Sequence, residues 1–278
     1  MTHRLVSPHG GELKELMVPA NRIQELRDLS RDMESWILTD RQVRDLELLM
    51  NGGFSPLLGF MSRPDYEAVR DGLRLTDGTL WPIPVTLDVT REVAEELASG
   101  QLLALRDPEG VLLAVLTVGD VWEPDRREEA EKVLGTGDPR HPGVDYLLHH
   151  AHPVCVGGTL EGVQAPVHYD FKKDRHTPGK LREEFARLGW RNVVGFHTRN
   201  PMHRAQVELT LRAARMAQAN LLIHPVVRMT QSGDLDHYTR VRCYEAVLSQ
   251  YPQFTVKLSL LDMASRLAGP REALWHAI

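Results

Sequence analysis

Residues 178–261 alternate between helix-like and strand-like segments, and this alternation constrains the fold more than any other feature of the sequence. The expected order is helix 178–188, strand 192–197, helix 202–219, strand 221–227, helix 236–250 and strand 254–261. Parallel strands need a long crossover connection, and a helix is the usual one. The alternation therefore predicts an α/β domain built on a parallel sheet, and three strands are few for such a sheet.

The preceding residues follow a different rhythm, in which short apolar strands are separated by turn residues. Strands are expected over 80–89, 101–107 and 110–122, where Val and Leu dominate and Pro, Gly and Asp fall between the runs. Two helices are expected over 39–53 and 62–72, each beginning with a Thr or Ser that can cap it. This pattern predicts a β-rich, barrel-like domain with helical additions.

A chain of 278 residues is long enough for two ordinary domains. We expect the β-rich domain over 1–165 and the α/β domain over 166–278, with a linker in the glycine-containing stretch 155–175. The last segment, 269–278, begins as a helix should but has no cap or polar tail after it. The α/β domain is therefore expected to be incomplete at its C-terminus.

Charge and composition exclude several classes of protein. The net charge of -5 argues against a nucleic-acid binder, which needs a broad basic surface. No window approaches the length of a membrane span, and the N-terminus lacks an apolar signal core, so a cytoplasmic protein without membrane contacts is expected. The two cysteines form no CxxC pattern, which gives neither a disulfide framework nor a cysteine zinc site.

A basic cluster lies where a predicted strand ends and a predicted helix begins, in GFHTRNPMHRAQVELT at 195–210. Ligands of open α/β sheets bind at such places, because the next helix presents unpaired N–H groups. Arg199 offers a planar donor fork, Asn200 a neutral donor, and His203 a donor that titrates near pH 7. His203 and Gln206 are three residues apart and share a helix face. The cluster predicts a site for a polyphosphate.

Two alternatives remain open at this stage. The cluster can also be a solvated helix N-terminus, and Arg204, Arg212 and Arg215 are expected to be ordinary surface residues. The histidines of HHAHP at 149–153 offer metal ligands, but a matching fourth ligand is missing, so no metal site is predicted there.

The basic cluster resembles the central motif of the ATP sulfurylase (sulfate adenylyltransferase) family, QTRNPxHxxH, which reads HTRNPMHRAQ at 197–206 here. The resemblance covers nearly the whole chain. Further matching stretches are NGGFSPLLGFMSRPDY at 51–66, WPIPVTLDV at 81–89, HPGVDYL at 141–147, HPVVRMTQSGDLDHYTRVRCYEAVL at 224–248 and GPREALWHAI at 269–278. So many long matches in order make the resemblance specific.

The resemblance implies a PUA-like β-barrel followed by a Rossmann-like nucleotidyltransferase α/β domain. The implied reaction joins sulfate to the α-phosphorus of ATP, with Mg2+ accompanying the nucleotide, and gives adenosine 5′-phosphosulfate (APS) and pyrophosphate. By the same resemblance Thr198, Arg199 and Asn200 are the catalytic residues, and the substrate ligands are His197, Arg199, Asn200, His203 and Gln206. The resemblance also implies a homo-oligomer that binds ATP, sulfate and APS.

The chain departs from the family motif at both ends. His197 stands in place of the family's Gln, and Gln206 in place of its second His; Arg228 and Gln231 replace a usual Gly and Lys. Losing a charged donor aimed at a transition state costs on the order of a hundredfold in rate. The family's GRD loop does not occur in these residues. We therefore expect weak or no sulfurylase activity from this region.

A second hypothesis follows from these departures. Members of the family occur fused to APS kinase, and a degenerate sulfurylase region can serve such a protein as a non-catalytic structural or regulatory module. These residues contain no P-loop motif, so kinase chemistry would have to come from another part of the protein.

Overall fold

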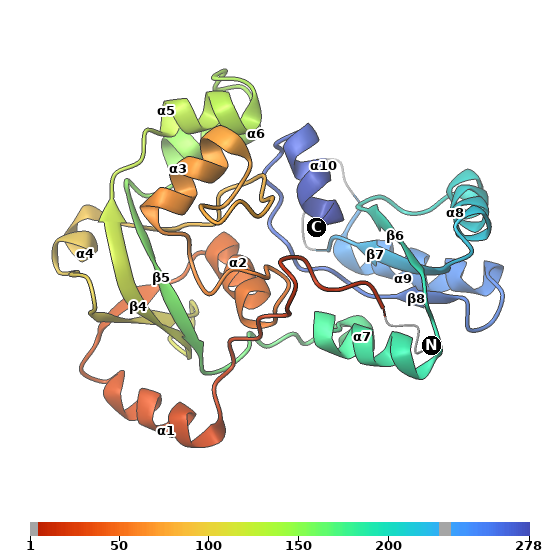
Figure 1. The fold of residues 1–278 in the computed structure, drawn as a ribbon, viewed down its shortest axis with the longest axis horizontal. Coiled ribbons are helices and arrows are strands. Elements are labelled where there is room, and N and C mark those ends of the chain that lie inside the picture. Colours follow the sequence, from red (N-terminus) through yellow and green to blue (C-terminus); the bar gives the residue numbers. More distant parts are fainter. Residues whose placement is uncertain (1–4, 228–234) are drawn as a thin grey trace. The chain divides into compact units, whose positions relative to one another are not determined.

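The computed structural model describes residues 5–227 and 235–278, which form two compact units (Figure 1). The first unit consists of His9–Pro166 together with Ser265–Ile278, and the second unit of Val167–Ala264 together with residues 5–8. Arg228 and Gln231 lie outside the described residues. Within the described residues, no helix has both the length and the apolar character needed to cross a membrane.

A five-stranded sheet organises the first unit, with strand order β1-β3-β4-β5-β2. Its strands are β1 Glu34–Ile37, β2 Leu87–Val89, β3 Leu102–Arg106, β4 Leu112–Trp122 and β5 Val154–Gly162. The pair β1 and β3 is parallel, whereas the other neighbours are antiparallel. The expected strands 101–107 and 110–122 are thus confirmed as β3 and β4.

The first unit also contains seven α-helices among the residues that the structure describes. They are α1 Ala20–Leu29, α2 Asp40–Met50, α3 Arg63–Gly72, α4 Arg91–Glu95, α5 Arg126–Glu129, α6 Pro142–Asp145 and α10 Pro270–Ala277, with π-helical turns at η1 Ala130–Leu134 and η2 Tyr146–His150. The two helices expected near 39–53 and 62–72 are confirmed as α2 and α3, and Thr39 and Ser62 cap them as predicted.

Two expectations for the first unit held only in part, and each for a backbone reason. Only Leu87–Val89 of the expected strand 80–89 is a strand, because Pro82 and Pro84 have no N–H to donate to a ladder. The expected linker 155–175 contains the boundary between the two units at Pro166 and Val167, but it begins inside β5. There a Cβ on Gly158 would lie 2.1 Å from the carbonyl oxygen of Thr117. The glycines there permit close backbone contact rather than a flexible connection.

The segment Ser265–Ile278 belongs to the first unit although it follows the second unit in the chain. Arg271 donates to the carbonyl oxygens of Val69 and Pro82 at 3.1 and 3.2 Å. Trp275 stacks on Phe54 with ring centroids 5.1 Å apart. Buried polar contacts and an aromatic stack therefore fix α10 to the unit formed by much earlier residues.

The second unit contains a three-stranded sheet in the order β6-β7-β8, and both strand pairs are parallel. Its elements are η3 Lys172–Asp174, α7 Pro178–Arg187, β6 Val193–Thr198, α8 Arg204–Met216, β7 Asn220–Pro225, α9 His237–Val247, η4 Leu248–Gln250 and β8 Val256–Leu258. The expected alternation is confirmed, with boundaries shifted by up to three residues. The α/β class with a β-rich first domain is also confirmed.

Apolar residues from the helices and strands share one core in the second unit. Val207 of α8, Val241 and Tyr244 of α9, and Ile223 of β7 are all buried in it. Both helices therefore have a fixed position against the sheet, and the loop between β6 and α8 begins and ends on rigid elements.

Candidate functional site

The loop between β6 and α8 contains the residues that the sequence singles out. Thr198, the last residue of β6, is 9% exposed. Its hydroxyl donates to the carbonyl oxygen of Asn200 at 3.1 Å and accepts from the N–H of Asn200 at 3.2 Å. The turn after the strand is thus closed by a side chain, which leaves the side chains of Arg199 and Asn200 exposed to solvent.

Two residues of α9 hold the backbone of this turn from its buried side. Arg240 Nη1 donates to the carbonyl oxygen of Arg199 at 3.0 Å, and Tyr244 Oη donates to that of Asn200 at 3.0 Å. Arg240 is 2% exposed and Tyr244 is fully buried. Burial raises the pKa of Tyr244 to about 12, so the hydroxyl keeps its proton at neutral pH. The carbonyls are therefore fixed while the side chains remain free to meet a ligand.

Arg240 is unusual because most of its guanidinium lacks hydrogen-bond partners. Among the residues that the structure describes, no acceptor bonds to Arg240 Nε or Nη2, although both atoms are buried. Sequence reasoning missed Arg240 and Tyr244. The only signal was their spacing of four residues on one helix face, which an ordinary core Tyr beside a surface Arg would also give.

Gln206, one of the two residues that depart from the family motif, closes the first turn of α8. Gln206 Oε1 accepts from the backbone N–H of His203 at 3.1 Å, and His203 is the residue before the helix. His203 and Arg204 are exposed, whereas Gln206 is half-buried. Gln206 therefore caps the helix with its oxygen, which leaves its amide nitrogen as the group able to donate to a ligand.

His197 lies on β6 directly opposite His224 on β7. Burial, together with the charges of His197 and His176, lowers the pKa of His224 to about 4. Burial also lowers the pKa of His176, with Lys257 adding to the effect. At neutral pH His224 and His176 are consequently uncharged, so the permanent positive charge in the turn itself comes from Arg199.

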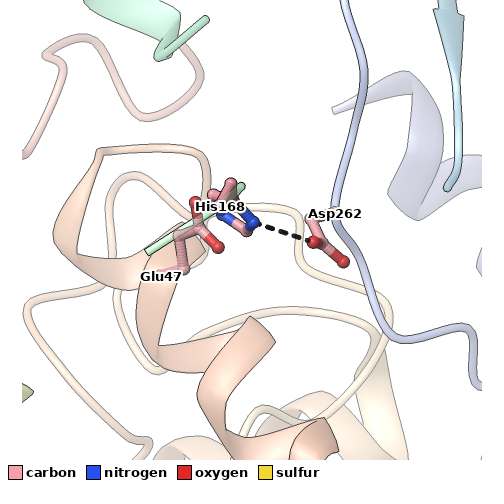
Figure 2. Close-up of side chains that lie close together, drawn as sticks. All are labelled: Glu47, His168 and Asp262. Atoms are coloured by element: carbon pink, nitrogen blue, oxygen red, sulfur yellow. Dashed lines mark ion pairs between the residues drawn. The ribbon is translucent and has the colours of Figure 1, made fainter. Parts of the chain in front are cut away.

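A charged network supports the start of α9, the helix that carries Arg240. Asp170 accepts from His237, the first residue of α9, and from Arg175 Nη2 at 3.0 Å. Burial opposes ionisation of Asp170, but the hydrogen bonds from His237 and Arg175 lower its pKa to about 2. Arg175 Nη1 also lies 3.4 Å from Asp262 Oδ2. His168 Nδ1 lies 3.7 Å from that same oxygen (Figure 2).

The five loop residues Thr198, Arg199, Asn200, His203 and Gln206 all lie on the strand end, the turn or the first helical turn. The histidines of the 149–153 stretch do not converge in the same way. His149 Nδ1 lies 2.8 Å from Asp145 Oδ1, and His150 Nε2 lies 3.3 Å from Asp145 Oδ2. Both of these histidines therefore contact the same carboxylate, Asp145, on the first unit.

Two family models match successive parts of the chain. Residues 6–165 match a PUA-like domain, and residues 172–278 match ATP-sulfurylase. The first match falls on the β-rich part of the chain, and the second includes the whole parallel sheet.

Proteins with known functions are similar over almost the full chain. The sulfate adenylyltransferase of Kluyveromyces lactis is 50% identical over 275 residues, which cover 98% of this chain and 55% of the relative. That of Schizosaccharomyces pombe is 51% identical over 257 residues, which cover 92% of this chain and 52% of the relative. The chain thus spans about half the length of these relatives.

A solved structure gives the same picture of the fold. A protein described as a hexameric APS kinase from Thiobacillus denitrificans matches with a TM-score of 0.82 and 35% identity, over 99% of this chain and 50% of that one. Because the fold, the family matches and the relatives agree, this chain, with a PUA-like domain followed by an ATP-sulfurylase domain, belongs to the ATP sulfurylase family.

Proposed function

We propose that the loop between β6 and α8 binds ATP and sulfate and catalyses the sulfate adenylyltransferase reaction. One observation carries the proposal. The carbonyls of Arg199 and Asn200 are held by Arg240 and Tyr244, while the Arg199 and Asn200 side chains are exposed at the carboxyl end of a parallel strand. A fixed backbone reduces the reorganisation needed to bring these donor side chains to a developing charge. The relatives named sulfate adenylyltransferase support this choice of chemistry.

In the proposed reaction a sulfate oxygen attacks the α-phosphorus of ATP. The new S–O–P linkage forms as the bond from the α-phosphorus to the bridging oxygen breaks, and pyrophosphate leaves with that bond's electron pair. Arg199 would hold sulfate through its guanidinium fork, and Asn200 would orient the phosphate oxygens. His203 and the open N–H groups at the start of α8 would bind the triphosphate.

Mg2+ enters this proposal as part of the substrate MgATP. Residues 197–207 contain no Asp or Glu, so this loop has no carboxylate ligand to offer the ion. Mg2+ commonly relies on substrate phosphates and retained water, and those would be its main ligands here.

We further propose that the two changed motif positions slow the reaction. Gln206 is neutral, and its oxygen is already used by the N–H of His203, so it can offer the leaving pyrophosphate only an uncharged amide. Losing a charged donor of this kind costs on the order of a hundredfold in rate. His197 replaces a Gln, and its imidazole presents a donor with a different geometry from that of the amide.

The test is the release of pyrophosphate from ATP and sulfate by the full-length protein. Arg199→Ala is expected to reduce turnover below detection, whereas Arg212→Ala, an exposed residue of α8 paired with Glu208, should leave it unchanged. The double variant His197→Gln with Gln206→His is expected to raise turnover. Rapid turnover by the unmutated protein would refute the proposal that His197 and Gln206 slow the reaction. An equal loss of turnover in the Arg199 and Arg212 variants would refute the assignment of the site to the loop between β6 and α8.

A second candidate function is a non-catalytic module beside an APS kinase. It is favoured by the similarity to a protein described as a hexameric APS kinase, of which this chain matches half. This candidate function predicts that even the double variant His197→Gln with Gln206→His releases no pyrophosphate. It also predicts that the protein is a hexamer in solution. Analytical ultracentrifugation and the same assay separate the two functions.

A further inference from the structure

A polar cavity lies inside the first unit and takes no part in the proposed reaction. Its volume is about 20 Å³, which is enough for one occupant of about the size of a water molecule. Charged side chains dominate its wall, namely Arg41, Arg126, Arg266, Asp88 and Glu129. All of these residues belong to the first unit.

Two of the three guanidinium groups have carboxylate partners. Arg126 Nη1 donates to Glu129 Oε2 at 2.9 Å, and Arg266 Nη2 donates to Asp45 Oδ2 at 2.5 Å. Arg126 also donates from Nη2 to the carbonyl oxygen of His152 at 3.1 Å. These pairs satisfy much of the charge of Arg126 and Arg266 within the protein.

Arg41 has no such partner. Its guanidinium lies 4.0 Å from the centroid of the Tyr146 ring, a cation–π contact that satisfies none of its N–H donors. Apart from this ring contact, the Arg41 guanidinium makes no hydrogen bond or ion pair with the residues that the structure describes. Burial lowers the pKa of Arg41 to about 10, and the charge of Arg266 adds to this effect. The charges of Asp45 and Asp88 and the Tyr146 ring partly offset this effect, so the counter-charge of Arg41 comes from carboxylates to which it is not hydrogen-bonded.

Three of the carboxylate oxygens of the wall residues Asp88 and Glu129 are already engaged. Asp88 Oδ1 accepts from Gln42 Nε2 at 3.0 Å, and Asp88 Oδ2 accepts from the N–H of His152 at 2.7 Å. Glu129 Oε2 accepts from Tyr66 Oη at 3.1 Å as well as from Arg126. The wall therefore has spare donors, and its own carboxylates are used by other groups.

From this excess of donors we propose that the cavity binds one small monovalent inorganic anion, with chloride as the representative. An anion needs only donors, whereas a water molecule must also find acceptors for its two protons. The volume disfavours a tetrahedral oxyanion such as sulfate. The bound anion accepts hydrogen bonds from Arg41 and stabilises the first unit, independently of catalysis.

The first test is crystallographic and uses bromide as the probe. Crystals of the full-length protein grown without chloride and soaked in sodium bromide are expected to give an anomalous peak between Arg41, Arg126 and Arg266. A peak absent from the cavity, or density explained by water alone, overturns the proposal.

The second test is thermal and uses chloride itself. At equal ionic strength, replacing sodium gluconate by sodium chloride is expected to raise the Tm by about 3 °C. The rise should vanish in Arg41→Gln and persist in the matched control Arg31→Gln, an exposed arginine paired with Asp28. If Arg41→Gln does not fold, Arg41→Lys replaces it, and a weaker chloride dependence is expected because Lys has fewer donors.

Two results of the thermal test contradict the proposal. An equal Tm in chloride and gluconate overturns it, even if bromide is seen in the crystal, since that combination means binding at crystal concentration only. A chloride effect that is the same in the Arg41 and Arg31 variants also overturns it, because the effect would then arise elsewhere.

Discussion

Replacement of Arg240 by Met is expected to separate the stability of the second unit from the function of its loop. The bond from Arg240 Nη1 to the carbonyl oxygen of Arg199 contributes about 1.5–3 kcal/mol, as hydrogen bonds to charged groups do. Against this, Nε and Nη2 are buried without hydrogen-bond partners among the described residues, and each such group costs about 1–3 kcal/mol. Met fills a similar volume, so the free energy of unfolding should change by less than about 2 kcal/mol.

Function should respond much more strongly to the same change. Without Arg240 the turn keeps only Tyr244 as its anchor from α9, and the ligand must then order the backbone of Arg199 itself. If losing this bond reduces the stabilisation of the bound transition state by about 1.5–3 kcal/mol, kcat/KM falls by about 10- to 150-fold.

Urea denaturation measures the first quantity, and pyrophosphate release by the full-length protein measures the second. Arg242→Met is the matched control, because Arg242 lies on the same helix with an exposed side chain. It should leave both quantities unchanged. The reasoning is refuted if Arg240→Met destabilises the protein by more than about 3 kcal/mol, or if it folds normally and keeps wild-type kcat/KM.

Three further substitutions test other parts of the structure. His224→Asn should flatten the pH dependence of unfolding. Because burial lowers the pKa of His224 to about 4, the unfolded chain takes up the proton first, and wild type loses about 2 kcal/mol between pH 7 and pH 5. Gln42→Leu should cost about 3–5 kcal/mol, since this buried amide bonds to an indole N–H, a backbone N–H, a backbone carbonyl and a carboxylate. Gly59→Ala should cost at least about 2 kcal/mol, because its Cβ would lie 2.1 Å from the carbonyl oxygen of Gly158.

Each of these substitutions has a control measured by the same urea titration. His203→Asn changes an exposed histidine and should keep the wild-type pH dependence. Gln24→Leu removes an exposed amide, and Gly72→Ala adds a methyl group where no atom lies within 4 Å; each should change stability by less than about 1 kcal/mol. If a control changes the free energy of unfolding, or its pH dependence, as much as its test variant does, the structural reason given for that test variant is contradicted.

The second unit was predictable because its elements are long and regularly spaced. The helical and apolar runs between Pro178 and Leu258 each extend over enough residues to show a period, and Thr177 and Asp236 mark helix starts through their side chains. The boundaries shifted where the chain turns, since turn geometry depends on contacts that a local pattern does not contain.

The first unit was predictable only in part, because several of its features depend on distant contacts. Trp81 and Ile83 are buried like strand residues, yet Pro82 and Pro84 prevent a strand there. Gly158 resembles a linker residue in the sequence and instead allows β5 to approach another backbone. No local pattern indicates that Trp275 packs on a ring more than two hundred residues earlier.

Only some residues of the candidate site could be predicted from the sequence. The exposed residues of the loop, such as Arg199 and Asn200, follow from the strand-to-helix position and the family motif. The anchors Arg240 and Tyr244 do not, because their role depends on how α9 packs beneath the turn. The capping use of Gln206 was also unforeseen, since the motif treats that position only as a ligand.

The return of Ser265–Ile278 to the first unit sets an order of events during synthesis. The ribosome makes the chain from the N-terminus, so the segment that completes the first unit emerges only after Val167–Ala264 has been made. Until then Asp45, which is 2% exposed in the finished unit, has no Arg266 to neutralise it, and the ring of Phe54 has no Trp275 to cover it. The part of the protein that is translated first is therefore among the last to reach its final state.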